Sequence, residues 1–286
     1  MDVAVVGAGR VGTSLAVLWR RAGHRVVGVA GGAATGQRAA RFLPGVPVLE
    51  GAEAARLAEI VVIATPDHSI APACEQLAAA GALDEVRAVA HASGAMGLDA
   101  LDAASGVART FAIHPLQTCP TVEAAIERIP GAVFAVTARD EAGFALGERL
   151  ALDAGGRPVR IADELKPLYH AAAVFASNYL VTVTAIAEQL ERTAGVPDPL
   201  AALAPLQEAT LANLGRVGPA GALTGPAVRG DAITVARNLD ALAEHAPEAV
   251  RPYVALADLA LELAERSGRL PAAGREAVAE VLARWR

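Results

Sequence analysis

The chain has 286 residues, of which 53% are hydrophobic and only 3% aromatic, and its formal net charge is −6. This length suits one large domain or two ordinary ones. The negative charge, with no basic stripe, disfavours binding to nucleic acid or to an anionic membrane surface. The abundance of small apolar side chains predicts a helix-rich core and some surface hidden in an oligomer.

The cysteine content and the start of the chain indicate a cytoplasmic protein. Cys74 and Cys119 match no metal or redox spacing, as expected in a reducing compartment. The first strand is expected by about Val3, which leaves no room for a signal peptide.

The first thirty residues predict a βαβ unit that binds a dinucleotide. The β-branched run VAVV precedes GAGRVG, then the helical stretch TSLAVLWRRAG and a second strand, RVVGVA. The glycines of G-x-G-x-x-G permit a tight turn, a close approach to pyrophosphate and helix–strand packing. The expected cofactor-binding residues of this turn are Gly7, Gly9, Arg10, Val11 and Gly12, with the N–H groups of Arg10 and Val11 directed at phosphate.

The residues after the second strand favour NADP(H) over NAD(H). A site for NAD usually has an acid there that holds the ribose 2′-OH, but no acid follows Ala30 until Glu50. Polar and basic side chains take that place, and Arg38 is the expected partner of a 2′-phosphate. Alternatively, Arg38 and Arg41 belong to the solvated face of the next helix.

Further strands and helices alternate as far as about Ala162. The expected strands lie in EIVVIATPD, VRAVAHASGAMG, ARTFAIHPLQTCP, GAVFAVTA and GGRPVRIA. This alternation predicts a doubly wound, largely parallel sheet. Thr65 and Pro66 follow one of these strands and are expected to contact the cofactor.

The remaining sequence predicts only helices. They are expected at 163–194, roughly 198–215, 231–245, 247–267 and 271–285. The chain is therefore expected to hold a Rossmann dinucleotide-binding domain, 1–162, and a helical domain for substrate and dimerisation, 163–286. The run from Pro167 to Ala187 has no charged Lys, Arg, Asp or Glu, but its polar residues favour a buried helix over a membrane span.

Several motifs place the chain beside known oxidoreductases. The order of domains resembles the superfamily of 6-phosphogluconate dehydrogenase, 3-hydroxyisobutyrate dehydrogenase, ketopantoate reductase and pyrroline-5-carboxylate reductase. VVGAGRVGTSLA, HASGA, HPLQT, LKPLYHAAAVFASNYL and LTGPAVRGD more closely resemble a family of Rossmann-like oxidoreductases with a C-terminal domain of unknown function. The resemblance implies an α/β fold with an all-α, 6-phosphogluconate-dehydrogenase-like C-terminal domain, and a homodimer that pairs through its helical domains.

The resemblance also suggests the catalytic residues. In better-known relatives the first long helix of the second domain carries a Lys and, four residues later, an Asn, both facing the nicotinamide. Here Lys166 matches the Lys, but His170 stands where the Asn is expected. Helical spacing puts Lys166, His170 and Ser177 on one face, with Asn178 about a quarter-turn away. Alternatively, Lys166 is a solvated residue of the first turn and His170 a satisfied core histidine.

Other candidates for substrate binding lie at strand ends and in one later loop. Ligands of open α/β sheets bind at the carboxyl ends of strands, and the expected contacts are His91, Ser93, His114, Ser177, Asn178, Thr224 and Arg229. For His91 and His114, the alternative is a loop or capping hydrogen bond. No metal-binding spacing links the histidines, so no metal is expected.

Together these features predict an NADP(H)-dependent oxidoreductase acting on a small anionic oxo acid, with ketopantoate as the first candidate, or on an imine. Cationic groups in the expected cleft favour the anion. The alternatives are a non-catalytic dinucleotide-binding regulator and an oxidoreductase that links NADP to a deazaflavin coenzyme.

Overall fold

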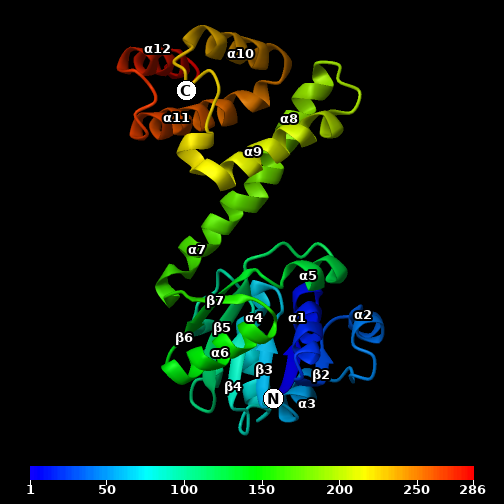
Figure 1. Cartoon of the computed structure of the whole chain (residues 1–286). Coiled ribbons are helices and arrows are strands. Elements are labelled where there is room, and N and C mark those ends of the chain that lie inside the picture. Colours follow the sequence, from blue (N-terminus) through cyan, green and yellow to red (C-terminus); the bar gives the residue numbers. More distant parts are fainter. The chain divides into compact units, whose positions relative to one another are not determined.

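The computed structural model describes all 286 residues, and these form two compact units, Met1–Asn178 and Tyr179–Arg286 (Figure 1). The first unit is built on a seven-stranded sheet and the second is entirely helical. The predicted fold class is therefore confirmed. The predicted domain boundary after Ala162 follows the end of the sheet, whereas the compact units divide after Asn178.

The sheet has the strand order β2-β1-β3-β4-β5-β6-β7. Neighbouring strands are parallel except β5 and β6, which are antiparallel. The strand order reverses next to β1, so the carboxyl ends of β1 and β3 border the crevice where a doubly wound sheet binds its ligand. The strands are β1 Asp2–Val6, β2 Arg25–Ala30, β3 Ile60–Ile63, β4 Ala88–His91, β5 Arg109–Pro115, β6 Val133–Ala138 and β7 Arg157–Arg160.

Each face of the sheet has its own hydrophobic core. Alternate residues of β1 point to opposite faces, so Val3 and Val5 belong to one core while Ala4 and Val6 belong to the other. The first core is covered by α1 (Arg10–Arg21), α2 (Thr35–Phe42), α5 (Val122–Arg128) and α6 (Glu141–Asp153). The second is covered by α3 (Gly51–Arg56), α4 (Ile70–Ala79) and the 3₁₀ segment Leu98–Ala104.

A long helix runs from the first unit into the second. It comprises α7 (Lys166–Ala173), a π-helical turn (Val174–Asn178) and α8 (Tyr179–Thr193). Together with Asp163–Leu165 it is long and apolar enough to cross a membrane by length and composition alone. In the single chain the most apolar stretch of this helix is not buried, so its burial stays a prediction that requires a partner surface.

The further helices of the second unit are α9 Pro199–Ala222, α10 Ala232–His245, α11 Val250–Arg266 and α12 Ala272–Ala283. The last three share a hydrophobic core whose buried residues include Val235, Leu261 and Leu282. The sequence predicted an end near residue 215, but α9 continues to Ala222 with a kink at Gly218. Gly218 has φ +70°, a conformation that glycine adopts without strain, and Pro219 follows it.

Candidate active site

The glycine turn at the start of α1 is shaped by contacts that only glycine allows. Gly7 has φ +97°, and a Cβ there would lie 2.5 Å from the backbone nitrogen of Thr65. A Cβ on Gly12 would lie 2.5 Å from the carbonyl oxygen of Gly7. No side chain caps α1. The first N–H groups of this helix therefore have no partner within it and form a place for an anion.

Beside this turn, the carboxyl ends of β1, β2 and β3 border a cavity of about 380 Å³. Thr65 lines this cavity, and its Oγ1 atom is buried without a hydrogen-bond partner, a state that a bound ligand would relieve. Arg38 Nε donates to the Ala8 oxygen at 2.8 Å, which holds its guanidinium beside the turn. The site thus combines an orphaned hydroxyl, free helix N–H groups and a cation beside the turn, and these groups together fit a dinucleotide phosphate.

The carboxylate of Glu50 also lies in the wall of this cavity. Glu50 is far from β2 along the sequence, so the sequence alone did not place it at this site. Glu50 returns to the site because Val48 forms a parallel bridge with Val29 in β2. Its side chain caps α3 in a capping box with Glu53. Glu50 is therefore engaged in holding its own helix.

Lys166 is fully enclosed, with 0% of its surface exposed, so the alternative of a solvated residue is wrong. Its Nζ donates to the Ser93 oxygen at 3.0 Å. Burial lowers the pKa of Lys166 to about 8, while the charges of Asp163 and Asp67 oppose that shift. Near neutral pH the ammonium is thus still charged but easily deprotonated.

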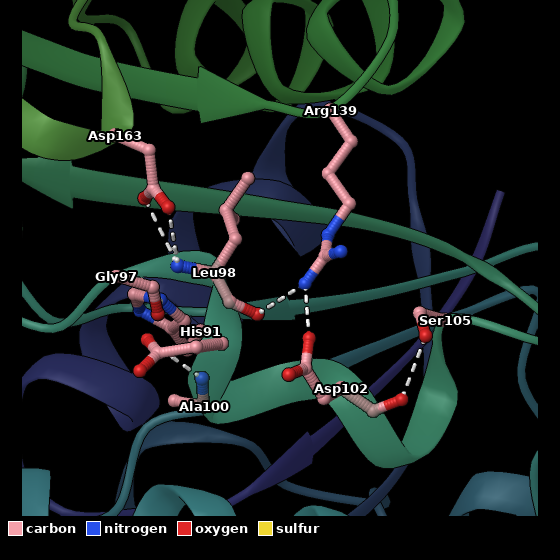
Figure 2. A network of polar contacts seen from close by, with 9 residues as sticks. His91, Gly97, Leu98, Ala100, Asp102, Ser105, Arg139 and Asp163 are labelled. Carbon is pink, nitrogen blue, oxygen red and sulfur yellow. Dashed lines mark hydrogen bonds and ion pairs between the residues drawn. The ribbon is translucent and has the colours of Figure 1, made fainter.

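The loop that receives Lys166 is held by a polar network, which Figure 2 shows. Asp163 stands three residues before Lys166, and its Oδ1 accepts from the Leu98 backbone nitrogen at 2.9 Å. Arg139 donates to the Leu98 oxygen and pairs with Asp102. The start of α7 is therefore fixed against the segment that follows β4.

His91 shapes this same loop, in agreement with the alternative considered from the sequence. It is completely buried; its Nδ1 accepts from the Ser93 nitrogen at 3.2 Å, and its Nε2 lies 3.2 Å from the Gly97 oxygen. Burial, reinforced by the Lys166 charge, lowers the pKa of His91 to about 3. With both ring nitrogens engaged and the ring neutral, we assign His91 a structural role instead of substrate contact. The Ser93 hydroxyl likewise accepts from the Ala95 and Met96 nitrogens.

His114, near the end of β5, is brought together with two residues of α7. The Tyr169 hydroxyl lies 3.2 Å from His114 Nδ1, and the His170 ring centroid lies 6.3 Å from that of His114. Burial and the Lys166 charge lower the pKa of His114 to about 4, and burial raises that of Tyr169 to about 12. Both groups are therefore uncharged at neutral pH. Gly94 makes room for this arrangement, because a Cβ there would lie 2.8 Å from His114 Cε1.

These three side chains line a cavity of about 540 Å³ within the first unit. Ser177 and Asn178 of the π-helical turn also line it. A π-helical turn changes which side chains share a face, and such turns are frequent at functional sites. The predicted grouping of Ser177 and Asn178 with His170 at one site therefore agrees with the geometry, while their contact with substrate stays a prediction.

Three other predicted residues belong to other elements. Pro66 precedes a 3₁₀ turn at the end of β3. Thr224 and Arg229 belong to the second unit, where both are exposed, and their contact with substrate stays a prediction. The chain contains no group of three or more His, Cys, Asp or Glu residues that could hold a metal ion.

Tyr169 and Asp163 are not among the residues predicted from the sequence. Tyr169 is next to His170, and its spacing of three from Lys166 was a usable signal. Asp163 gave no such signal, because its partner Leu98 lies 65 residues away in the sequence.

Two family models match the chain. A Rossmann-like domain matches residues 1–115, and a domain of unknown function, DUF2520, matches residues 132–260. The chain is a Rossmann-like protein with a C-terminal DUF2520 domain. No curated protein is significantly similar to it in sequence.

Solved structures share the fold of this Rossmann-like DUF2520 protein. Bacteroides fragilis BF3122, described as a candidate NADP oxidoreductase, is 22% identical, with 91% of this chain and 97% of that chain covered and a TM-score of 0.74. Protein TM1727 of Thermotoga maritima is 22% identical, with coverages of 93% and 100% and a TM-score of 0.71. A reductive aminase from Aspergillus terreus, in complex with NADPH and ethyl levulinate, is 20% identical, with coverages of 100% and 99% and a TM-score of 0.65. At these identities the similarity establishes the fold alone.

Proposed function

We propose that the chain is an NADP(H)-dependent oxidoreductase that transfers hydride to or from a C=O or C=N group. The supporting observation is that one unit holds both the glycine turn with its cavity and the cluster of Lys166, His114, Tyr169 and His170. Strands β1, β3, β4 and β5 are consecutive in the sheet, so both features lie along the same carboxyl edge. The neighbours of known fold include proteins solved with NADPH, NADP and NAD+.

NADP(H) is the proposed cofactor because Arg38 stands beside the glycine turn, where a ribose 2′-phosphate needs a cation. Arg41 is engaged elsewhere, in an ion pair with Glu123. The other proposed cofactor contacts come from the glycine turn and from the loop after β3: Gly7, Gly9, Arg10, Val11, Gly12, Thr65 and Pro66.

When bound, NADPH supplies the hydride. The chain must then provide a proton and stabilise negative charge at the substrate oxygen or nitrogen, a contribution of ~10²–10⁴ in rate for a positioned acid. His170 and Tyr169 line the cavity and are the proposed donors. Lys166 does not line it, so its ammonium is proposed to act by its positive charge and by fixing the loop at Ser93.

The experiment measures NADPH binding and NADPH consumption by the full chain. The panel comprises ketopantoate, pyrroline-5-carboxylate, 3-oxo acids, neutral ketones and imines, and an oxidised deazaflavin coenzyme. Consumption with a carbonyl or imine compound supports the proposal, and consumption only with the deazaflavin favours the coenzyme-linked alternative. Tight binding without any consumption favours the regulator, and the absence of binding overturns the proposal.

We also propose a homodimer formed through the helical residues. In the single chain, Phe175 and Val181 are each 68% exposed and Leu206 is 65% exposed. Apolar surface of this extent marks an interaction site, and a second copy supplies a matching surface by symmetry. Light scattering should give a dimer at micromolar concentration, and Val181→Asp should weaken it; a monomeric wild-type chain would contradict the proposal. Cytoplasmic location stays a prediction.

A further inference from the structure

We infer that the cavity beside His114 binds a neutral substrate with an apolar body, not the carboxylate-bearing substrate expected from the sequence. This inference rests on the proposed oxidoreductase function and names its substrate class. Its starting point is the wall of the cavity: twelve residues line it, and none is Lys, Arg, Asp or Glu.

The wall is largely apolar. Leu116, Ala172, Ala173, Val174 and Ala176 contribute only hydrocarbon. Its polar groups are hydroxyls, amides and imidazoles. Such a surface favours hydrocarbon and leaves a small number of groups to orient one polar function.

The group that could bind an anion most directly is held neutral. The pKa of His114 is lowered to about 4 by burial and by the charge of Lys166, and the charge of Asp67 opposes this shift. His114 is therefore uncharged at pH 7. His170 Nδ1 is buried without a hydrogen-bond partner, so a single polar ligand atom could supply what the ring lacks.

The nearby ammonium is not available to a ligand carboxylate. Lys166 is enclosed, its Nζ donates to the Ser93 oxygen, and it does not line the cavity. A carboxylate in this cavity would meet no Lys or Arg side chain, so any hydration that it lost would not be replaced by a contacting ammonium or guanidinium. A ketone or imine needs only one hydrogen bond at its oxygen or nitrogen, and the Tyr169 hydroxyl or the His170 ring can provide it.

The reaction balances for such a substrate. A hydride from NADPH forms a C–H bond at the carbonyl or imine carbon while the π bond breaks, and a side-chain proton forms the O–H or N–H bond. The substrate is reduced by two electrons and the nicotinamide is oxidised by two. No charged substituent is needed for either transfer.

The test compares phenylacetone with phenylpyruvate, two ketones of the same shape that carry a methyl group and a carboxylate at the same position. Binding to the full chain in the presence of NADP+ is followed by calorimetry or by NMR line broadening. We expect phenylacetone to bind at least ~10-fold more tightly. Ala173→Arg places a cation in the wall and should shift the preference toward phenylpyruvate. Ala171→Arg, at an exposed position of α7 outside the lining, is the matched control and should leave the preference unchanged.

Equal or tighter binding of phenylpyruvate to the wild-type chain overturns the inference, as does binding of neither compound at millimolar concentration. NADP+ binding is measured separately on the same samples. If NADP+ fails to bind, the proposed function is wrong, and the two ketones are then compared on the free chain. The cavity chemistry and the proposed function can therefore fail independently.

Discussion

The two ends of the proposed site are built by different means. At the nucleotide end, backbone geometry decides: Gly7 and Gly12 permit contacts that no side chain would allow. At the substrate end, partly buried side chains from β5 and α7 meet around His114, and the fully buried Lys166 lies at the start of α7. The residues of the nucleotide end's glycine turn lie within one short stretch of sequence. The residues of the substrate end are distant in sequence and come together only when the chain folds.

At the substrate end, the titration of Lys166 should make the stability of the folded chain depend on pH. Its pKa is about 8 in the folded chain against 10.5 for the ordinary side chain, so between these values the unfolded state binds more protons. Wild-type stability relative to Lys166→Met should therefore rise with pH through this window, by up to about 3 kcal/mol, and the gain should be lost as pH falls to 8. Denaturant unfolding of both proteins from pH 7 to 10.5 measures this. A constant difference would mean that Lys166 is not buried as described.

The nucleotide end should respond to the smallest addition of volume. Gly12→Ala brings a methyl group against the Gly7 oxygen, so the turn must shift, and NADPH affinity should fall by about 100-fold. Gly106→Ala is the control, because a Cβ there meets nothing within 4 Å. Nicotinamide fluorescence titration measures the NADPH affinity of both variants. Equal affinities of the two variants would remove the glycine turn from the site.

These two ends also differ in how far the sequence predicted them. The glycine turn, the strands and the helical second unit could be read from local periodicity and turn residues. Lys166 and His170 could be proposed from spacing and resemblance, but the enclosure of His91 could not. Its two partners, Ser93 and Gly97, act through backbone atoms whose positions depend on the folded loop. The π-helical turn likewise was not predicted from local sequence.

Gly94 belongs to the substrate end, but like the glycines of the nucleotide end it acts through its lack of a side chain. Gly94→Ala should displace the His114 ring and lower turnover on the order of 10- to 100-fold, because small misplacements in an active site are costly. NADPH affinity should be unchanged. Steady-state kinetics with the fastest substrate of the panel, together with the NMR shifts of the His114 ring, measures both effects. Unchanged turnover with a displaced ring would exclude His114 from the reaction.

The smallest effect is expected at the edge of the nucleotide end. Arg38→Ala should weaken NADPH binding by about tenfold and leave NADH binding unchanged, because only the 2′-phosphate requires the guanidinium. Titration of both cofactors is the measurement, and Arg41→Ala is the control because Arg41 pairs with Glu123. An equal loss for both cofactors would indicate that Arg38 supports the turn through Ala8 and does not read the phosphate.

A crystal structure of the chain with NADP+ tests the central claim most directly. The account predicts the pyrophosphate at the N–H groups of Arg10 and Val11, the 2′-phosphate at Arg38, and the nicotinamide beside the cavity that His114, Tyr169 and His170 line. A cofactor bound with its nicotinamide away from this cavity, or bound outside the glycine turn, would contradict it.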